Sequence, residues 1–97
     1  MTEQQSHQRQ MQIKASDETL KGVYANTMQV FHTKQEFVLD FMNTFPPAGT
    51  LNARVIISPA HLKQIIAVLV ENLNKYEGNF GKVEASEALS NTIGFQA

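Results

Sequence analysis

The chain has no cysteine, only three prolines, no long apolar segment and almost no net charge. Without cysteine it has no disulfides, no thiol chemistry and no zinc–thiolate sites, which fits a cytoplasmic protein. Its longest apolar run, Ile65–Val70, is far shorter than the ~20 residues that span a bilayer. The first 20 residues are polar and lack the apolar core of a signal peptide. We therefore expect a cytoplasmic protein with no membrane partner.

The charge balance disfavours nucleic acid as a partner. The formal net charge is −1, and no stretch of Lys and Arg is dense enough to neutralise a row of phosphates. An apolar fraction of 42% is close to the globular average, so one small domain with a core is expected. We expect a disordered N-terminal tail at 1–10, a single domain at 11–83 and a flexible C-terminal arm at 84–97.

The segment Ser58–Tyr76 predicts one long helix, around which the rest of the chain is organised. Ser58 suits the N-cap, because its hydroxyl accepts a hydrogen bond from a free amide of the first turn. Pro59 then occupies the first helical position, where its missing N–H costs nothing. Gly78 or Gly81 can end the helix in a left-handed turn. Apolar residues recur at helical spacing and form one stripe: Leu62, Ile65, Ile66, Leu69, Leu73 and Tyr76.

Several other segments predict strands. Val23–His32 is rich in β-branched and aromatic residues, and Glu36–Met42 alternates between two faces. Arg54–Ser58 predicts a short strand that leads directly into the helix. Met11–Ala15 alternates weakly and could add a short edge strand. Asn43–Asn52 contains two prolines and a glycine, which predicts a loop.

Together these elements predict an α+β fold, in which an antiparallel meander of three to four strands is followed by one long C-terminal helix packed on the sheet. Asp17–Gly22 predicts a turn, or a single helical turn, before the first long strand. One helix covers only one face of such a sheet, and both strand faces carry apolar residues. A chain this short also gains from a second subunit. We therefore expect a two-fold symmetric homodimer, with interface candidates Val38, Met42, Val68 and Val70.

No constellation of catalytic residues stands out, so we expect no enzyme, no cofactor and no metal. The three histidines lack metal-ligand spacing; a composite site of His32, His61 and Glu36 is one alternative, and exposed polar residues near element ends are the simpler one. Glu36 and Asp40 share a strand face and could form a carboxylate pair. Asp40 beside Arg54 as a cross-strand charge pair is equally natural.

Aromatic and amide side chains leave two further alternatives open. The strand residues Tyr24, Phe31, Phe37 and Phe41 resemble a base-stacking sheet, but the few basic residues near them favour core packing. Two asparagines interrupt apolar faces, and each is either exposed or hydrogen-bonded across an interface, where it would fix the register. The candidate binding residues are Asn26, Asp40, Arg54, His61 and Asn72.

Four segments carry a resemblance to a known family. They are G-V-Y-A-N (22–26), E-F-V-L-D-F (36–41), A-R-V-I-I-S-P-A-H (53–61) and E-N-L-N-K-Y-E-G-N-F-G (71–81). In order and spacing the chain resembles, over residues 13 to 83, a family of small prokaryotic proteins known only as a domain of unknown function. The resemblance implies that these residues sit on the family's pattern: Tyr24, Asn26, Phe37, Asp40, Phe41, Arg54, Pro59, His61, Asn72 and Tyr76. Relatives tend to carry lysines in the loop before the Arg54 strand, whereas this chain has P-P-A-G-T-L-N there.

The family implies no activity, so function is inferred from the residues. The first hypothesis is a non-enzymatic, homo-oligomeric interaction module that binds itself and a further protein. The second is a small nucleic-acid-associated regulator, which needs a basic surface. The third is a ligand- or anion-binding protein that uses the strand–helix junction at Arg54–His61, where the start of the helix favours an anion.

Overall fold

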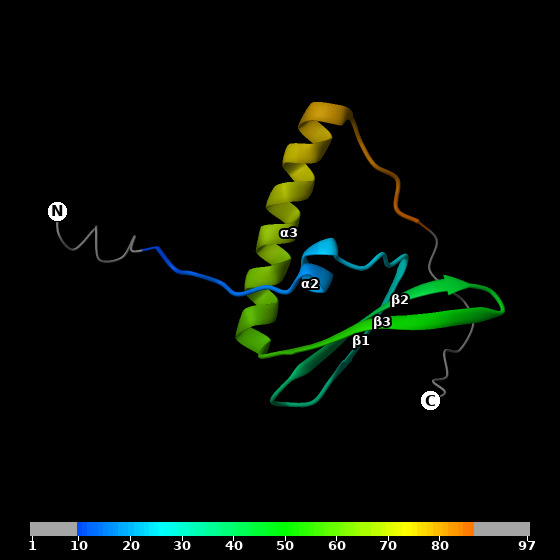
Figure 1. The fold of residues 1–97 in the computed structure, drawn as a ribbon. Coiled ribbons are helices and arrows are strands. Elements are labelled where there is room, and N and C mark those ends of the chain that lie inside the picture. Colours follow the sequence, from blue (N-terminus) through cyan, green and yellow to red (C-terminus); the bar gives the residue numbers. More distant parts are fainter. Residues whose placement is uncertain (1–9, 87–97) are drawn as a thin grey trace.

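The computed structural model describes residues 10–86, in which three antiparallel strands precede one long helix (Figure 1). The elements are α2 (Asp17–Lys21), β1 (Thr27–His32), β2 (Phe37–Phe45), β3 (Ala48–Ile57) and α3 (Pro59–Phe80). The strands lie in the order β1-β2-β3, so each pairs with its neighbour along the chain. The predicted α+β meander is therefore confirmed. The expected N-terminal tail (1–10) and C-terminal arm (84–97) lie largely outside the described residues.

The central strand β2 has the predicted alternation between two faces. Leu39, buried, points to one face, and Asp40 and Met42, both buried, point to the other. Ile57 of β3 is the only other buried apolar residue among residues 10–86. The core of a single chain is therefore very small for so apolar a sequence.

Two sequence expectations were wrong in the strand region. Met11–Ala15 forms no strand, and no fourth strand occurs within residues 10–86. The predicted loop Asn43–Asn52 instead belongs almost entirely to a hairpin, because β2 continues to Phe45 and β3 begins at Ala48. The cis peptide Pro46–Pro47 forms the tight turn between them. Proline is tolerated at this point because a turn requires no ladder N–H from these two residues.

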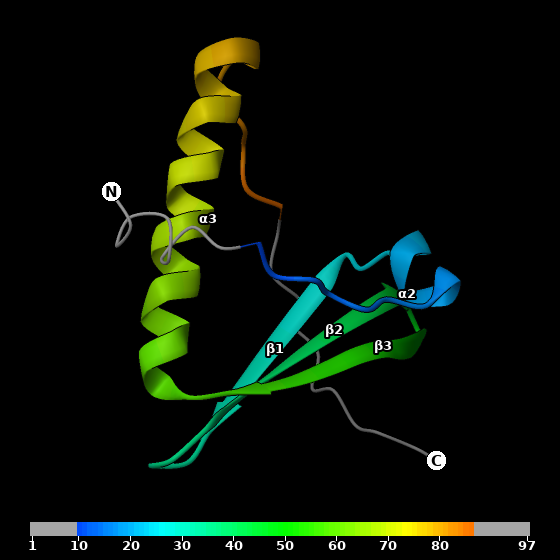
Figure 2. The same ribbon diagram turned by 60° about the vertical axis from the view of Figure 1, so that its left-hand side comes forward.

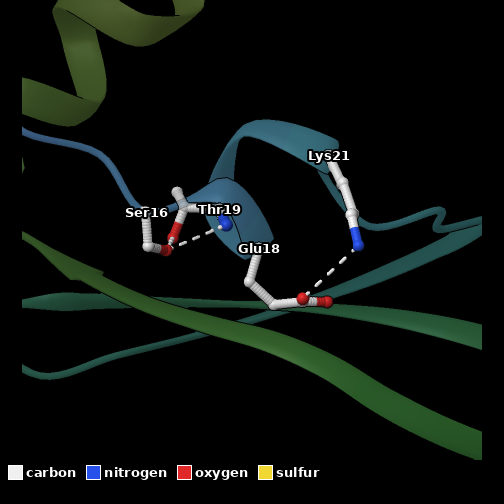
Figure 3. A network of polar contacts seen from close by, with 4 residues as sticks. All are labelled: Ser16, Glu18, Thr19 and Lys21. Carbon is white, nitrogen blue, oxygen red and sulfur yellow. Dashed lines mark hydrogen bonds and ion pairs between the residues drawn. The ribbon is translucent and has the colours of Figure 1, made fainter.

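The predicted helical turn before β1 is confirmed as α2 (Figure 3). The Ser16 hydroxyl accepts a hydrogen bond from the Thr19 amide at 3.1 Å and so caps the helix. Lys21 lies 3.6 Å from Glu18, an exposed pair that contributes little stability. Gly22 follows with φ +77°, a left-handed conformation that glycine adopts without a steric penalty.

Helix α3 begins at its predicted cap and ends at the second of the two glycines proposed for its C-terminus. The Ser58 hydroxyl accepts from the His61 amide at 3.1 Å, and Pro59 takes the first position. The helix runs four residues beyond the predicted Tyr76, and Gly81 ends it with φ +98° while its N–H donates to the Glu77 carbonyl. Its 22 residues do not form a helix long and apolar enough to cross a membrane, and neither does any other helix within residues 10–86.

The position of α3 differs from the expected packing on the sheet. No residue of α3 is buried, and the helix rises away from the strands after leaving β3 (Figure 2). Ser58 alone separates the last residue of β3, Ile57, from Pro59. One residue is too short a connection for the helix to turn back and lie across the sheet, since even tight strand–helix loops use two or more residues. The apolar stripe of α3 is therefore largely uncovered in one chain.

Candidate functional site

The most strongly bound polar group lies at the centre of the sheet. Asp40 of β2 and Arg54 of β3 are paired in register, so of the two alternatives left open for Asp40 the structure has the cross-strand charge pair. The Arg54 Nε donates to Asp40 Oδ1 and its Nη2 donates to Oδ2, both at 2.7 Å. This two-point geometry matches the planar fork of guanidinium to both carboxylate oxygens. Glu36 lies outside the strand and is exposed, so it forms no carboxylate pair with Asp40.

Burial makes this ion pair unequal. The Asp40 side chain has no exposed surface, whereas that of Arg54 is about half exposed, at 47%. The hydrogen bonds and charge of Arg54 lower the pKa of Asp40 below its ordinary value of 3.8, although burial opposes this shift. The same contact raises the pKa of Arg54. Asp40 is therefore a buried, ionised carboxylate, and both of its oxygens accept hydrogen bonds from Arg54. This contact holds β2 and β3 together.

Gln29 extends this polar row to the third strand, a feature the sequence did not reveal. It pairs in register with Asp40, so polar side chains of β1, β2 and β3 lie side by side on one face. The Gln29 Oε1 is buried and accepts no hydrogen bond within residues 10–86. The only sign of it in the sequence was a polar residue, Gln29, between Met28 and Val30. Which residue of β2 it faces depends on the register between β1 and β2.

Asn26 is a structural residue that ties the start of β1 to β2. Its Nδ2 donates to the Thr44 carbonyl at 3.0 Å, and its Oδ1 accepts from the Thr44 amide at 2.9 Å. The Thr27 hydroxyl also donates to that oxygen. Asn52, absent from the sequence candidates, donates from Nδ2 to the Tyr24 carbonyl at 2.6 Å. Both amides therefore hold the chain ahead of β1 against the hairpin.

The other polar candidates make local contacts. His61 is exposed, and its Nδ1 lies 3.1 Å from Gln64 Oε1 one turn further along α3. Asn72 donates from Nδ2 to the Val68 carbonyl of its own helix at 3.1 Å. His32 packs its ring against Phe37, 5.3 Å between centroids. Across residues 10–86 no three His, Asp or Glu side chains gather into a group that could hold a metal ion.

The four interface candidates differ in accessibility. Met42 is only 3% exposed and therefore belongs to the core of the single chain. Val38 is half-buried, whereas Val68 and Val70 of α3 are exposed.

A larger apolar surface runs along α3 beside Val70, whereas Val68 lies toward the other side of the helix. We call it the α3 stripe and define it by six residues: Leu62, Ile66, Leu69, Leu73, Tyr76 and Phe80. All except the half-buried Leu62 are exposed, from 49% at Leu73 to 74% at Phe80. Tyr76 and Phe80 contact each other with ring centroids 4.9 Å apart. The sequence predicted five of these residues together with Ile65, which is half-buried and lies beside the stripe. It missed Phe80, because it ended the helix one turn early.

The comparisons with known proteins identify one family. Neither curated proteins nor solved structures gave a match. The family model described as "Protein of unknown function (DUF3467)" matches residues 1–85. The chain therefore belongs to this family of proteins of unknown function.

Proposed function

We propose that this chain is a non-enzymatic interaction module that works as a homodimer, in which a second copy covers the apolar surface of α3. The observation that carries the proposal is a 22-residue helix with no buried residue and six apolar side chains on one side. A helix without tertiary packing is only marginally stable in water, because most helical stability in proteins comes from burying such a stripe. A partner surface on α3 would supply that packing.

The free energy gained by covering this stripe is comparable to the whole stability of a small domain. Burying the exposed half of a Leu or Ile side chain contributes on the order of 1 kcal/mol, so six such residues contribute roughly 5 kcal/mol per subunit. Further large apolar residues are exposed on the sheet, including Val30, Val55 and Ile56. An exposed apolar surface of this extent is typical of an interaction site.

The other hypotheses receive less support from the contacts. The strand–helix junction proposed for an anion has Arg54 bound to Asp40, and the Ser58 hydroxyl already satisfies the His61 amide. A nucleic-acid regulator would need a basic surface, which a net charge of −1 does not favour. A cytoplasmic location belongs to the same proposal, because a chain with no cysteine needs no oxidising compartment to fold.

Light scattering coupled to size exclusion, repeated over a range of protein concentrations, tests self-association. We expect a mass of twice 10.9 kDa at micromolar concentration. We expect little change between low and high salt, because the contact is mainly apolar. A folded species of 10.9 kDa at every concentration would contradict the proposal.

A further inference from the structure

We propose that α3 pairs with the α3 helix of a second copy, running antiparallel across a two-fold axis. This inference rests on the proposed self-association and specifies its geometry. The six residues of the α3 stripe are separated by four, three, four, three and four positions along the chain. Alternation of four and three is the heptad spacing of a seam between two helices. The expected occupant of the stripe is therefore a helix.

The stripe is symmetric about its own centre, as an antiparallel pair requires. We place two antiparallel copies so that the two-fold axis crosses the helix pair at the level of residue 71. Three kinds of side-chain layer then form, and symmetry makes each occur twice. Leu62 meets Phe80, Ile66 meets Tyr76, and Leu69 meets Leu73 of the other copy. Each aromatic ring then faces an aliphatic side chain. A two-fold contact of this kind uses the same surface on both subunits and closes at the dimer.

Charge decides between the antiparallel and the parallel arrangement. Lys63, Val70 and Glu77 follow one another at intervals of seven along one edge of the α3 stripe. In a parallel pair this edge faces the opposite edge of the other helix, so Lys63 and Glu77 never meet. Reversing one helix places Lys63 opposite Glu77 of the other copy, twice by symmetry, and Val70 opposite Val70. Only the antiparallel pair therefore joins opposite charges.

The positions of these charges within α3 support the same direction. Lys63 lies near the start of the helix and Glu77 lies in its last turns, and each end of the helix dipole disfavours the charge placed there. An antiparallel neighbour brings each charge to the end of a helix that favours it. The ion pair within α3, Lys75–Glu71 at 3.9 Å, lies on the side away from the stripe. Glu77 is half-buried, and its Oε2 also accepts from the Val83 amide at 3.0 Å.

Charge reversal tests this geometry on the full chain. Lys63→Glu and Glu77→Lys each turn two attractive contacts of the pair into two repulsive ones, so we expect each variant to dimerise about tenfold more weakly. The double variant K63E/E77K restores both attractions and is expected to return to the wild-type dissociation constant. An equimolar mixture of the two single variants should form heterodimers, detected by native mass spectrometry.

Two control variants separate charge from local structure. Glu77→Gln keeps an acceptor for the Val83 amide and removes only the charge, and should weaken the dimer less than Glu77→Lys. Glu71→Lys reverses a charge on the far side and should leave the dissociation constant unchanged. If the wild-type protein dimerises but both single reversals bind like wild type, or the double variant stays weak, the antiparallel pairing is wrong while self-association stands. If the wild-type protein is a monomer, the proposed function itself fails.

Discussion

Replacing Leu73 with glutamate is expected to convert the dimer into monomers. Leu73 lies at the middle of the α3 stripe, 49% exposed in one chain, and faces Leu69 of the other copy in the antiparallel pair. A carboxylate at this position loses the apolar contact and must either be desolvated or hold the helices apart. We expect the dissociation constant to rise at least about 100-fold, measured by sedimentation of L73E against wild type. The melting temperature of L73E should also no longer depend on protein concentration.

Two variants serve as controls for this substitution. Leu20→Glu introduces the same change at an exposed leucine of α2, 72% exposed and outside the α3 stripe. Gln64→Glu adds a carboxylate to α3 on the side away from the stripe. Both should dimerise like wild type. Wild-type affinity in L73E, or equal weakening in L20E, would show that the stripe is not the contact between copies.

Removing the guanidinium of Arg54 is expected to destabilise the fold more than removing the carboxylate of Asp40. The variant R54L leaves a fully buried carboxylate without its two donors, whereas D40L leaves an arginine that is half exposed and can turn to water. Removing one partner of a buried ion pair destabilises the fold most when the partner that remains is the buried charge. We expect the melting temperature of R54L to fall by roughly 10 °C or more, and that of D40L to fall less.

The double variant D40L/R54L is the control for this asymmetry. It leaves no unpaired charge and should recover most of the loss seen in R54L, because an apolar pair can replace a buried ion pair at little cost. Arg54→Lys keeps the charge but not the two-point geometry, so its melting temperature should lie between those of wild type and R54L. All variants are compared at one protein concentration, since dimerisation adds to stability. A fall in D40L as large as that in R54L would contradict the asymmetry.

The same pair gives the fold a defined dependence on pH. The pKa of Asp40 lies below 3.8 in the folded protein and returns to about that value on unfolding. Between the two values the unfolded chain binds the extra proton, so the free energy of unfolding falls as the pH is lowered through this window. Above about pH 5 the contribution of the pair is fully present. The decrease in the free energy of unfolding on acidification, measured by denaturant titration, should be smaller in D40L than in wild type.

The sequence predicted the parts of the fold that depend on local chemistry. Ser58 and Pro59 marked the start of α3, and Gly81 was one of the two glycines proposed for its end, because capping needs only nearby backbone groups. Alternation in β2 predicted which residues share a face, and with the strand order this brought Asp40 beside Arg54. These features require no knowledge of distant segments beyond the order of the strands.

The parts that depend on register and direction were not predicted. A register shift at Phe41 and Met42 changes which residues of β2 and β3 face each other further along their hairpin. No residue type in that stretch indicates the shift. The contacts of Asn26 with Thr44 were missed for another reason: they depend on how β1 pairs with β2, and the sequence placed Thr44 in a loop. The wide apolar stripe suggested that the sheet covers α3. The direction of α3 is set instead by the single residue between β3 and the helix, which leaves no room for the helix to turn back.

The distance between spin labels on two copies tests the antiparallel pairing of α3 most directly. Because the chain has no cysteine, Gln64→Cys and Glu71→Cys each introduce one labelling site on the outer side of α3. In the antiparallel pair the two copies of residue 64 are offset along the helix axis by 14 positions, about 21 Å, and those of residue 71 by none. Pulsed EPR should therefore give a longer distance between copies for Q64C than for E71C. Equal distances would contradict the antiparallel direction, and no coupling between copies would contradict the pairing itself.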